Sequence, residues 1–225
     1  MQLVRKVLAL SVLCLLVAGA PASAQVRINE LDSDQVGADA GEFVELFDGG
    51  VGNTSLTGLV LVFYNGSNDL SYAAFDLDGQ TTNASGYWTL GNVGVPGVDL
   101  TFANDNLQNG ADAVALYTGD ASAFPTNTPV TTTANLLDAI VYDTADADDP
   151  GLLVLLNAGQ PQVDENGGGN GTGHSNQRCP NGSGGLRNTT SYLQATPTPD
   201  ASNAVSCTPT ATSESTWGRV KQLYR

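Results

Sequence analysis

The order of apolar and polar positions along the chain predicts many short β-strands. After residue 25, short apolar runs are separated by Gly, Asn, Asp and Ser, and no long stretch has the 3.6-residue periodicity of a helix. This pattern is typical of an all-β fold. The predicted strands are 26–31, 43–47, 59–64, 72–77, 87–90, 98–102, 113–118 and 137–142.

Some of these segments also predict which way their side chains face. In 98–102 the apolar residues alternate with Asp99 and Thr101, so one face should be buried. Segment 59–64 is apolar on both faces and should lie inside a sheet. In 42–47 each face carries one Glu, and the alternation therefore does not identify the buried face. Segment 149–157 fits either a short helix or another strand.

Turn signals separate the predicted strands. Asn65-Gly66, Asp78-Gly79, Asn109-Gly110 and Gly119-Asp120 supply residues that tolerate a positive φ angle, as hairpin turns require. We expect a single domain over 25–207, long enough for a core between two sheets.

The first 24 residues are expected to be an export signal. Arg5 and Lys6 precede an apolar run over 7–19, and Ala22-Ser23-Ala24 is the small-residue pattern of a cleavage site. The run is shorter than the roughly 20 residues that a membrane-spanning helix needs. A retained membrane anchor is the alternative. We expect a secreted or surface-displayed chain without a transmembrane segment after cleavage.

Cysteine content agrees with export. Cys14 lies in the predicted signal, which leaves Cys179 and Cys207 as one candidate disulfide in an oxidising compartment. In the chain-entropy estimate a bridge across a loop of this length contributes about 3–4 kcal/mol. Two free thiols, or separate metal ligands, are the alternatives.

The charge balance is strongly acidic. The chain has 8 Lys and Arg against 23 Asp and Glu, a net charge of −15, and the predicted domain contains no Lys. Such a surface repels phosphate backbones, so we expect no direct binding to nucleic acid.

Five motifs, taken in order, resemble the lamin-tail domain family. Segment 26–31 reads V-R-I-N-E-L, segment 41–48 reads G-E-F-V-E-L-F-D, and segment 55–61 reads S-L-T-G-L-V-L. Near the other end, 174–178 (H-S-N-Q-R) and 195–203 (A-T-P-T-P-D-A-S-N) are similar to the closing motifs of bacterial members. Leu59 stands where the family often has Trp, and Asp200 replaces a Gly.

The resemblance implies an immunoglobulin-like β-sandwich. Bacterial lamin-tail domains occur on secreted or surface proteins, often beside nuclease or phosphatase domains, and their own role is inferred to be binding or attachment. The family has no catalytic residues to transfer to this chain. For Asn29 and Glu30 we expect a structural role, in bonds to backbone at a strand edge, rather than ligand binding.

The residue inventory argues against catalysis. His174 is the single His and no G-x-S-x-G motif accompanies it, which disfavours a Ser–His–acid site. Phosphodiester hydrolysis needs metal-held carboxylates with basic groups nearby, and these are scarce. We therefore expect no enzyme. A hydrolase that uses two carboxylates is the alternative, because Asp and Glu are abundant.

One acidic stretch is a candidate calcium site. Asp143, Asp146, Asp148 and Asp149 are closely spaced in a loop before Pro150-Gly151, and converging carboxylates suit a hard cation. The spacing does not fit an EF-hand. The alternative is a solvated acidic turn without a bound cofactor.

The C-terminal residues differ from the domain. Segment 208–216 is a Thr/Ser/Pro linker, and 217–225 is basic, with apolar residues at helical spacing. Such a tail suits recognition of a protein groove or tethering at the cell surface. A disordered end is the alternative. The residues expected to take part in recognition are Trp217, Arg219, Lys221, Tyr224 and Arg225.

Together these features predict a non-catalytic binding or structural module, for adhesion or scaffolding. The expected partner is an extracellular protein or a glycan. The alternative is a small extracellular hydrolase, or an accessory module of a nuclease or phosphatase system.

Overall fold

A computed structural model describes residues 25–131 and 135–203. The predicted export signal, Cys207, the linker 208–216 and the tail 217–225 lie outside the described residues. The expectations for those segments, including the Cys179–Cys207 disulfide, therefore stay predictions.

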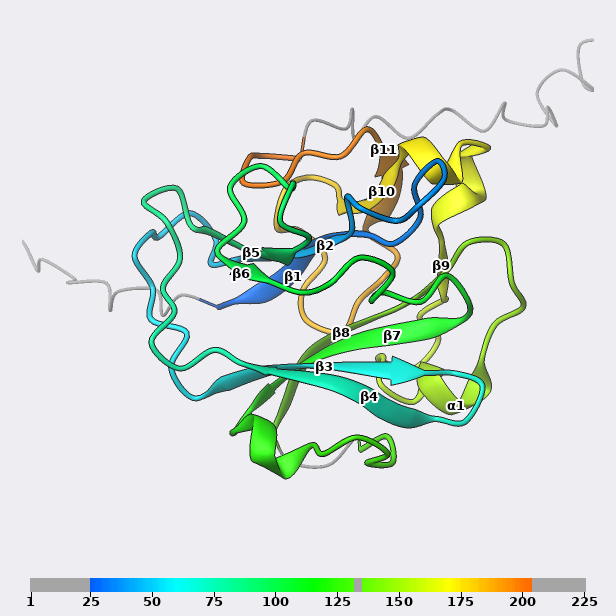
Figure 1. Ribbon diagram of the computed structural model, residues 1–225, viewed down its shortest axis with the longest axis horizontal. Helices are drawn as coiled ribbons and strands as arrows, with labels where there is room; N and C mark the ends of the chain where they lie inside the picture. Colours follow the sequence, from blue (N-terminus) through cyan, green and yellow to red (C-terminus); the bar gives the residue numbers. More distant parts are fainter. Residues whose placement is uncertain (1–24, 132–134, 204–225) are drawn as a thin grey trace, which may run out of the picture.

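The described chain forms two β-sheets that face each other (Figure 1). The six-stranded sheet has the order β11-β10-β1-β2-β5-β6, with β1 at Arg27–Asp32, β2 at Phe43–Phe47, β5 at Tyr87–Gly91, β6 at Leu100–Thr101, β10 at Ser175–Arg178 and β11 at Tyr192–Ala195. The five-stranded sheet has the order β4-β3-β7-β8-β9, with β3 at Leu59–Asn65, β4 at Leu70–Asp76, β7 at Asp112–Thr118, β8 at Leu136–Asp143 and β9 at Val163–Asp164.

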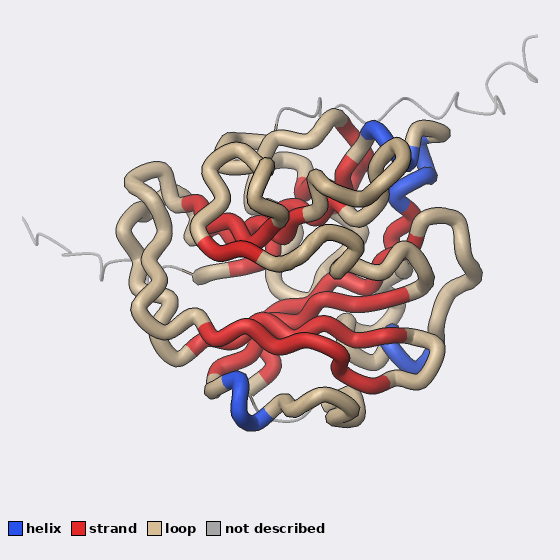
Figure 2. Tube along the Cα trace, viewed as in Figure 1, coloured by secondary structure: helices blue, strands red, loops and turns tan. Residues whose placement is uncertain are grey.

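Helical structure is scarce in the described residues (Figure 2). The short helices are α1 at Pro150–Leu153 and the 3₁₀ turns η1 at Ala121–Ala123, η2 at Glu165–Gly168 and η3 at Gly171–Gly173. Most strand pairs are antiparallel, whereas β6 and β9 pair in parallel with β5 and β8. The prediction of an all-β sandwich is confirmed.

The main apolar core fills the space between the two sheets. Its side chains come from alternate positions of the strands, because successive residues of a strand point to opposite faces. Burying one such side chain contributes about 1.5–3 kcal/mol. Fully buried members include Ile28, Val44, Leu46, Leu61, Phe63, Trp88, Leu90, Val114, Leu116 and Ile140.

A second apolar cluster covers the outer face of the five-stranded sheet, the face turned away from the core. Val60, Val62 and Tyr64 of β3 point there, while Leu61 and Phe63 point into the core. Strand β3 lies between β4 and β7, so the prediction of an interior strand that is apolar on both faces is confirmed.

The cover of this cluster comes from two loop segments. Phe124 lies just after η1, and Leu152, Leu155 and Leu156 come from α1 and the residues that follow it. Segment 149–157 therefore contains a short helix rather than a strand. Asp149 starts α1 by accepting hydrogen bonds from the N–H groups of Gly151 and Leu152.

The outer face of the six-stranded sheet is polar. Along it lie Gln177 of β10, Glu30 of β1, Glu45 of β2 and Thr89 of β5, each paired in register with the next and each fully buried. Residues 196–203 cover this row through hydrogen bonds described below. Strand β2 is therefore buried on both faces. For this reason the alternation of its residues in the sequence did not identify a single buried face.

The predicted strand 98–102 is shorter in the structure. Only Leu100–Thr101 pairs as β6, because Asp99 and Phe102 bond to Thr89 and Gly91 of β5 outside a regular ladder. The predicted alternation is present, since Leu100 packs on the core and Asp99 is exposed. No helix in the described residues is long and apolar enough to cross a membrane.

Candidate ligand-binding site

The polar side chains of the first two strands are bonded inside the fold. The Nδ2 group of Asn29 donates to Glu45 Oε1 at 2.8 Å and to Asn203 Oδ1 at 3.2 Å. Glu30 Oε1 accepts from the Ser175 hydroxyl at 2.6 Å. All five side chains are buried. These bonds give Asn29 and Glu30 a structural role.

A buried ion pair connects the two sheets. Arg178 of β10 lies 3.0 Å from Asp138 of β8, and both side chains are fully buried. Asp138 also accepts the N–H of Ile28 at 2.9 Å. Burial raises the pKa of Asp138, and the guanidinium of Arg178 opposes that shift. Sequence reasoning included Arg178 in a motif but missed Asp138, whose position in an apolar strand was the available signal.

Arg178 also organises the loop after β10. Its guanidinium donates to the carbonyls of Ser183 and Gly185, each at 2.8 Å, and stacks 4.8 Å from the ring centre of Tyr192. One charged side chain thus replaces the apolar contacts that this Gly-rich loop cannot make.

Two further buried carboxylates fix loops at the end of the sandwich that lies on the right in Figure 1. Glu42 accepts the N–H groups of Asn106 and Leu107, and Glu165 accepts those of Ser33 and Asp34. Burial raises the pKa of Glu42 to about 7 and that of Glu165 to about 9. These carboxylates replace regular pairing where the strands end.

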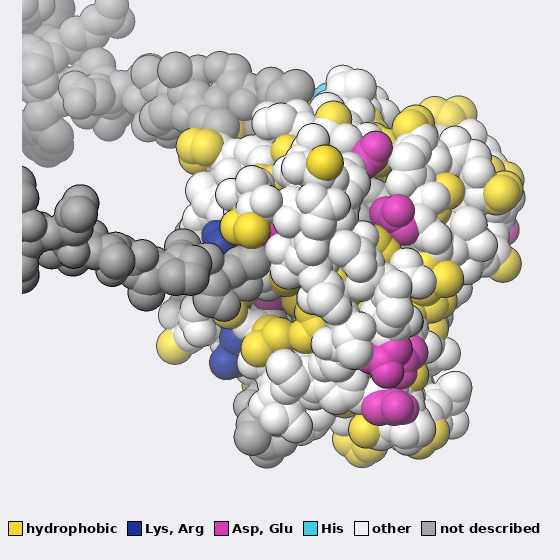
Figure 3. Space-filling view, turned by 90° about the vertical axis from the view of Figure 1, so that its left-hand side faces the viewer, with side chains coloured by type: hydrophobic (Ala, Val, Ile, Leu, Met, Phe, Trp, Pro, Cys, Tyr) yellow, Lys and Arg dark blue, Asp and Glu magenta, His cyan; other side chains and the backbone are white. Residues whose placement is uncertain are grey.

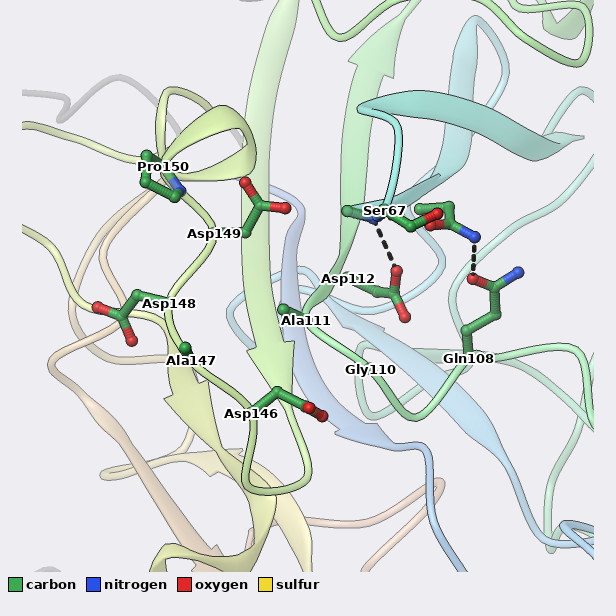
Figure 4. Close-up of a pocket in the computed structure, with 12 residues that line it drawn as sticks. Ser67, Gln108, Gly110, Ala111, Asp112, Asp146, Ala147, Asp148, Asp149 and Pro150 are labelled. Atoms are coloured by element: carbon green, nitrogen blue, oxygen red, sulfur yellow. Dashed lines mark hydrogen bonds between the residues drawn. The ribbon is translucent and has the colours of Figure 1, made fainter.

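The same end of the sandwich contains a cavity of about 620 Å³ (Figure 4). Its walls are the turn between β3 and β4, the loop before β7 and the loop between β8 and α1. The lining side chains with polar or charged groups are Asn65, Ser67, Gln108, Asp112, Asp146, Asp148 and Asp149. Among the residues that the structure describes, no basic residue lines it.

Three of the four predicted calcium ligands line this cavity. Asp146 and Asp148 are exposed, and Asp149 is half-buried because it caps α1. Asp143 is turned away: its Oδ1 accepts the N–H of Asp146 at 3.0 Å, and its Oδ2 accepts from Gln162 at 2.6 Å. Asp143 therefore holds the shape of the loop.

Asp112 is the lining residue that sequence reasoning missed. It begins β7, is nearly fully buried, and accepts the N–H of Gly66 at 2.9 Å. Burial, together with the charges of Asp146 and Asp149, raises its pKa to about 6. A lone acid at the start of an apolar strand was the only available signal, because its neighbours lie more than 30 residues away in the sequence.

The cavity has the chemistry of a site for cationic groups. Several carboxylates surround it, and no positive charge from the described part of the chain compensates them, which favours a positively charged ligand. Across 25–131 and 135–203, however, no three acidic, His or Cys side chains are placed to hold a metal ion. Calcium binding stays a prediction.

The opposite end of the sandwich has a different surface. A groove of about 560 Å³ there is lined by apolar and hydroxyl side chains, among them Val26, Thr57, Leu59 and Leu137. Figure 3 views this end, where apolar side chains gather beside basic ones and the acidic side chains lie to one side. The two ends thus offer a partner different chemistry.

Compared with known proteins, the chain matches no protein-family model and no curated protein.

Proposed function

We propose that the chain is a secreted or surface-displayed binding or structural module, non-catalytic, with a lamin-tail-like and immunoglobulin-like sandwich. The observation that carries this proposal is the position of the side chains of the lamin-tail-like motifs. Asn29, Glu30, Glu45 and Arg178 are buried and bonded to other parts of the fold. The motifs thus maintain the framework, and contact with a partner is left to the loops.

The surface that we assign to the partner is the acidic end of the sandwich. Asp146 and Asp148 are exposed there, and Asp112 lies at the bottom of the cavity wall with a raised pKa. A partner with exposed ammonium or guanidinium groups, such as a basic patch on an extracellular protein or an amino sugar of a glycan, would neutralise these carboxylates. The tail 217–225 would tether the module at the cell surface.

Site-specific photocrosslinking tests this assignment. A benzophenone amino acid at Ala147, an exposed residue of the cavity wall, should crosslink to components of the native cell envelope. The same group at Val51, which is 58% exposed in the loop after β2, is the matched control. Equal crosslinking from both positions, or none from either, would contradict the assignment.

One observation favours the hydrolase alternative. A buried carboxyl with a pKa raised to about 6, beside other carboxylates in a cavity, resembles the acid of a two-carboxylate hydrolase. Purified protein should be assayed on phosphoester and glycan panels. Hydrolysis that Asp112→Asn abolishes, and that Asp143→Asn leaves intact, would replace the binding proposal.

A further inference from the structure

Residues 196–203 cross the outer face of the six-stranded sheet. The N–H and the hydroxyl of Thr198 each donate to Glu30 at 2.8 Å, and the N–H of Asp200 donates to Glu45 Oε2 at 2.8 Å. Before these contacts, the carbonyl of Thr196 accepts from Gln177 at 2.7 Å. The segment therefore passes over β10, β1 and β2 in turn, and each contact is made to a polar side chain of the sheet.

Two more contacts define where the segment ends. The carboxylate of Asp200 accepts from the side chain of Asn83, and the space beside Gly97 is so small that a Cβ there would collide with Asp200. Asn203 then turns back and donates to the carbonyls of Asn29 and Arg178, at 3.3 and 2.9 Å. We name residues 196–203 the strap.

The strap is attached without apolar anchoring. None of its residues belongs to either apolar cluster of the described chain, and Thr196, Asp200, Ala201 and Ser202 are exposed. Segments with few buried apolar contacts and exposed backbone hydrogen bonds open at a lower free energy than the core. The strap should therefore open while both sheets stay folded.

The strap does not provide a hydrogen-bond partner for every polar atom in the row of side chains beneath it. Gln177 Oε1 and Thr89 Oγ1, on either side of the two carboxylates, are buried and have no hydrogen-bond partner within the described residues. An unpartnered buried polar atom destabilises the closed state, because it has lost its bonds to water without gaining others. Opening would expose both atoms to water, and so their mismatch lowers the cost of opening.

We propose that the strap is a releasable cover of the six-stranded sheet, held closed by the hydrogen bonds that it donates to Glu30 and Glu45. In the closed state the two carboxylates, neighbours across β1 and β2, are fully enclosed. In the open state they face water, and the polar row of the sheet becomes accessible.

The burial of the two carboxyl groups and the charges near them make the opening of the strap depend on pH. Burial raises the pKa of Glu30 and raises that of Glu45 further, whereas open carboxyls would titrate near their ordinary values. The closed state therefore binds more protons than the open state, and opening becomes more favourable as pH rises. The other titratable or charged groups on this side are Arg27 and Asp32 on β1, Tyr87 on β5, Asp99 before β6 and Asp200 on the strap.

The acids among these groups act in the same direction. Burial raises the pKa of Asp99, and the charge of Asp200 raises it further. Asp200 also adds to the shift of Glu45. The charge of Arg27 acts on Arg178 and Asp138, and its guanidinium donates to the carbonyl of Gly182.

Amide hydrogen exchange on the secreted chain tests the proposal residue by residue. The amides of Thr198 and Asp200 donate directly to Glu30 and Glu45, and the amide of Ala115 in central β7 reports opening of the whole fold. After correction for intrinsic exchange, the two strap amides should open more easily than Ala115. Their opening constant should also rise between pH 5 and pH 8.5.

Two substitutions test the contributions of the strap and of the sheet separately. Thr198→Val removes one hydroxyl from the strap without touching the sheet, and should raise the opening constant about tenfold, the factor that corresponds to loss of one hydrogen bond. Glu45→Gln should reduce the pH dependence. Glu165→Gln, at a buried carboxylate that bonds a different loop, is the matched control and should leave the strap amides unchanged.

Two results would overturn the proposal. One is exchange of Thr198 and Asp200 with the same opening free energy as Ala115 at every pH, because the strap would then open only when the fold does. The other is an equal effect of Thr198→Val and Glu165→Gln. If Glu45→Gln does not fold, Thr198→Val and the wild-type pH series still decide the question.

Discussion

The outer faces of the two sheets are covered in different ways. On the five-stranded sheet, Leu152, Leu155 and Leu156 belong to one apolar cluster with Val60 and Val62. On the six-stranded sheet, the strap lies over Glu30 and Glu45, and the contact consists of hydrogen bonds. Both covers bury the strands beneath them completely, so burial alone does not distinguish them.

The difference teaches how each cover responds to its surroundings. Apolar burial is non-directional and scales with the area removed from water, so it does not depend on pH. A hydrogen bond to a buried carboxylate depends on geometry and on the charge of the acceptor. We therefore expect the apolar cover to fail only with the whole fold, and the polar cover to respond to single bonds and to pH.

The largest loss of stability should come from a substitution in the apolar cover. Leu155→Ala removes a fully buried side chain and should lower the free energy of unfolding by about 2–5 kcal/mol, from lost transfer energy and the cavity left behind. Urea unfolding measures this loss. Val154→Ala, at a neighbour that is 50% exposed, is the control and should change stability by less than about 0.5 kcal/mol. A small effect of Leu155→Ala would mean that the α1 segment is dispensable.

The next effect concerns pH. Burial raises the pKa of Asp32 to about 8, in addition to the raised values of Glu42 and Glu165. The folded state then binds more protons than the unfolded state between about pH 4 and pH 9, and stability should fall as pH rises through this window. We expect the free energy of unfolding to be lower at pH 9 than at pH 5.

Urea midpoints across this pH range measure the loss. The difference between wild type and Leu155→Ala should be the same at both ends of the range, because the apolar cover does not titrate. A midpoint that rises with pH would contradict the assignment of raised pKa values.

A smaller global effect is expected when the strap loses one bond. Thr198→Val should lower the free energy of unfolding by about 1.4 kcal/mol, the equivalent of the tenfold rise in the opening constant of the strap. The same urea titration measures it. A loss as large as that of Leu155→Ala would show that the two covers are equally integral to the fold.

The smallest effect should come from calcium. Ligand binding at a hundredfold excess over its dissociation constant stabilises a protein by about 2.7 kcal/mol. Since Asp143 is turned away from the cavity, we expect thermal melts in millimolar calcium and in chelator to differ little. A large difference, removed by Asp146→Ala with Asp148→Ala, would establish a metal site.

The sequence predicted the parts of the fold that depend on local pattern. The two apolar faces of β3 and the alternation in 98–102 are visible in adjacent residues, and both are present in the structure. Strand β11 was missed, because Tyr192–Ala195 has no clear alternation: Tyr192 is buried and the next three residues are partly or fully exposed.

The candidate site was predicted only in part, because its contacts come from distant segments. Asp146, Asp148 and Asp149 are neighbours in sequence and were found together. Asp112 reaches the same cavity from β7 through the pairing of β7 with β8. Asp143 fits the spacing of a ligand, yet its bond to Gln162 depends on how the loop closes. The spacing of the acidic residues in the sequence does not show how the loop closes.

The pairing of the first and last segments has a consequence for how the chain folds. Strand β1 lies between β2 and β10, and Glu30 bonds to Thr198, which is 168 positions later in the sequence. Closing such distant contacts costs chain entropy before it yields stabilising energy, and sheets built this way fold in milliseconds to seconds. The six-stranded sheet is complete only after β11, at Tyr192–Ala195, has been synthesised. The six-stranded sheet therefore cannot be completed during most of the synthesis of the chain.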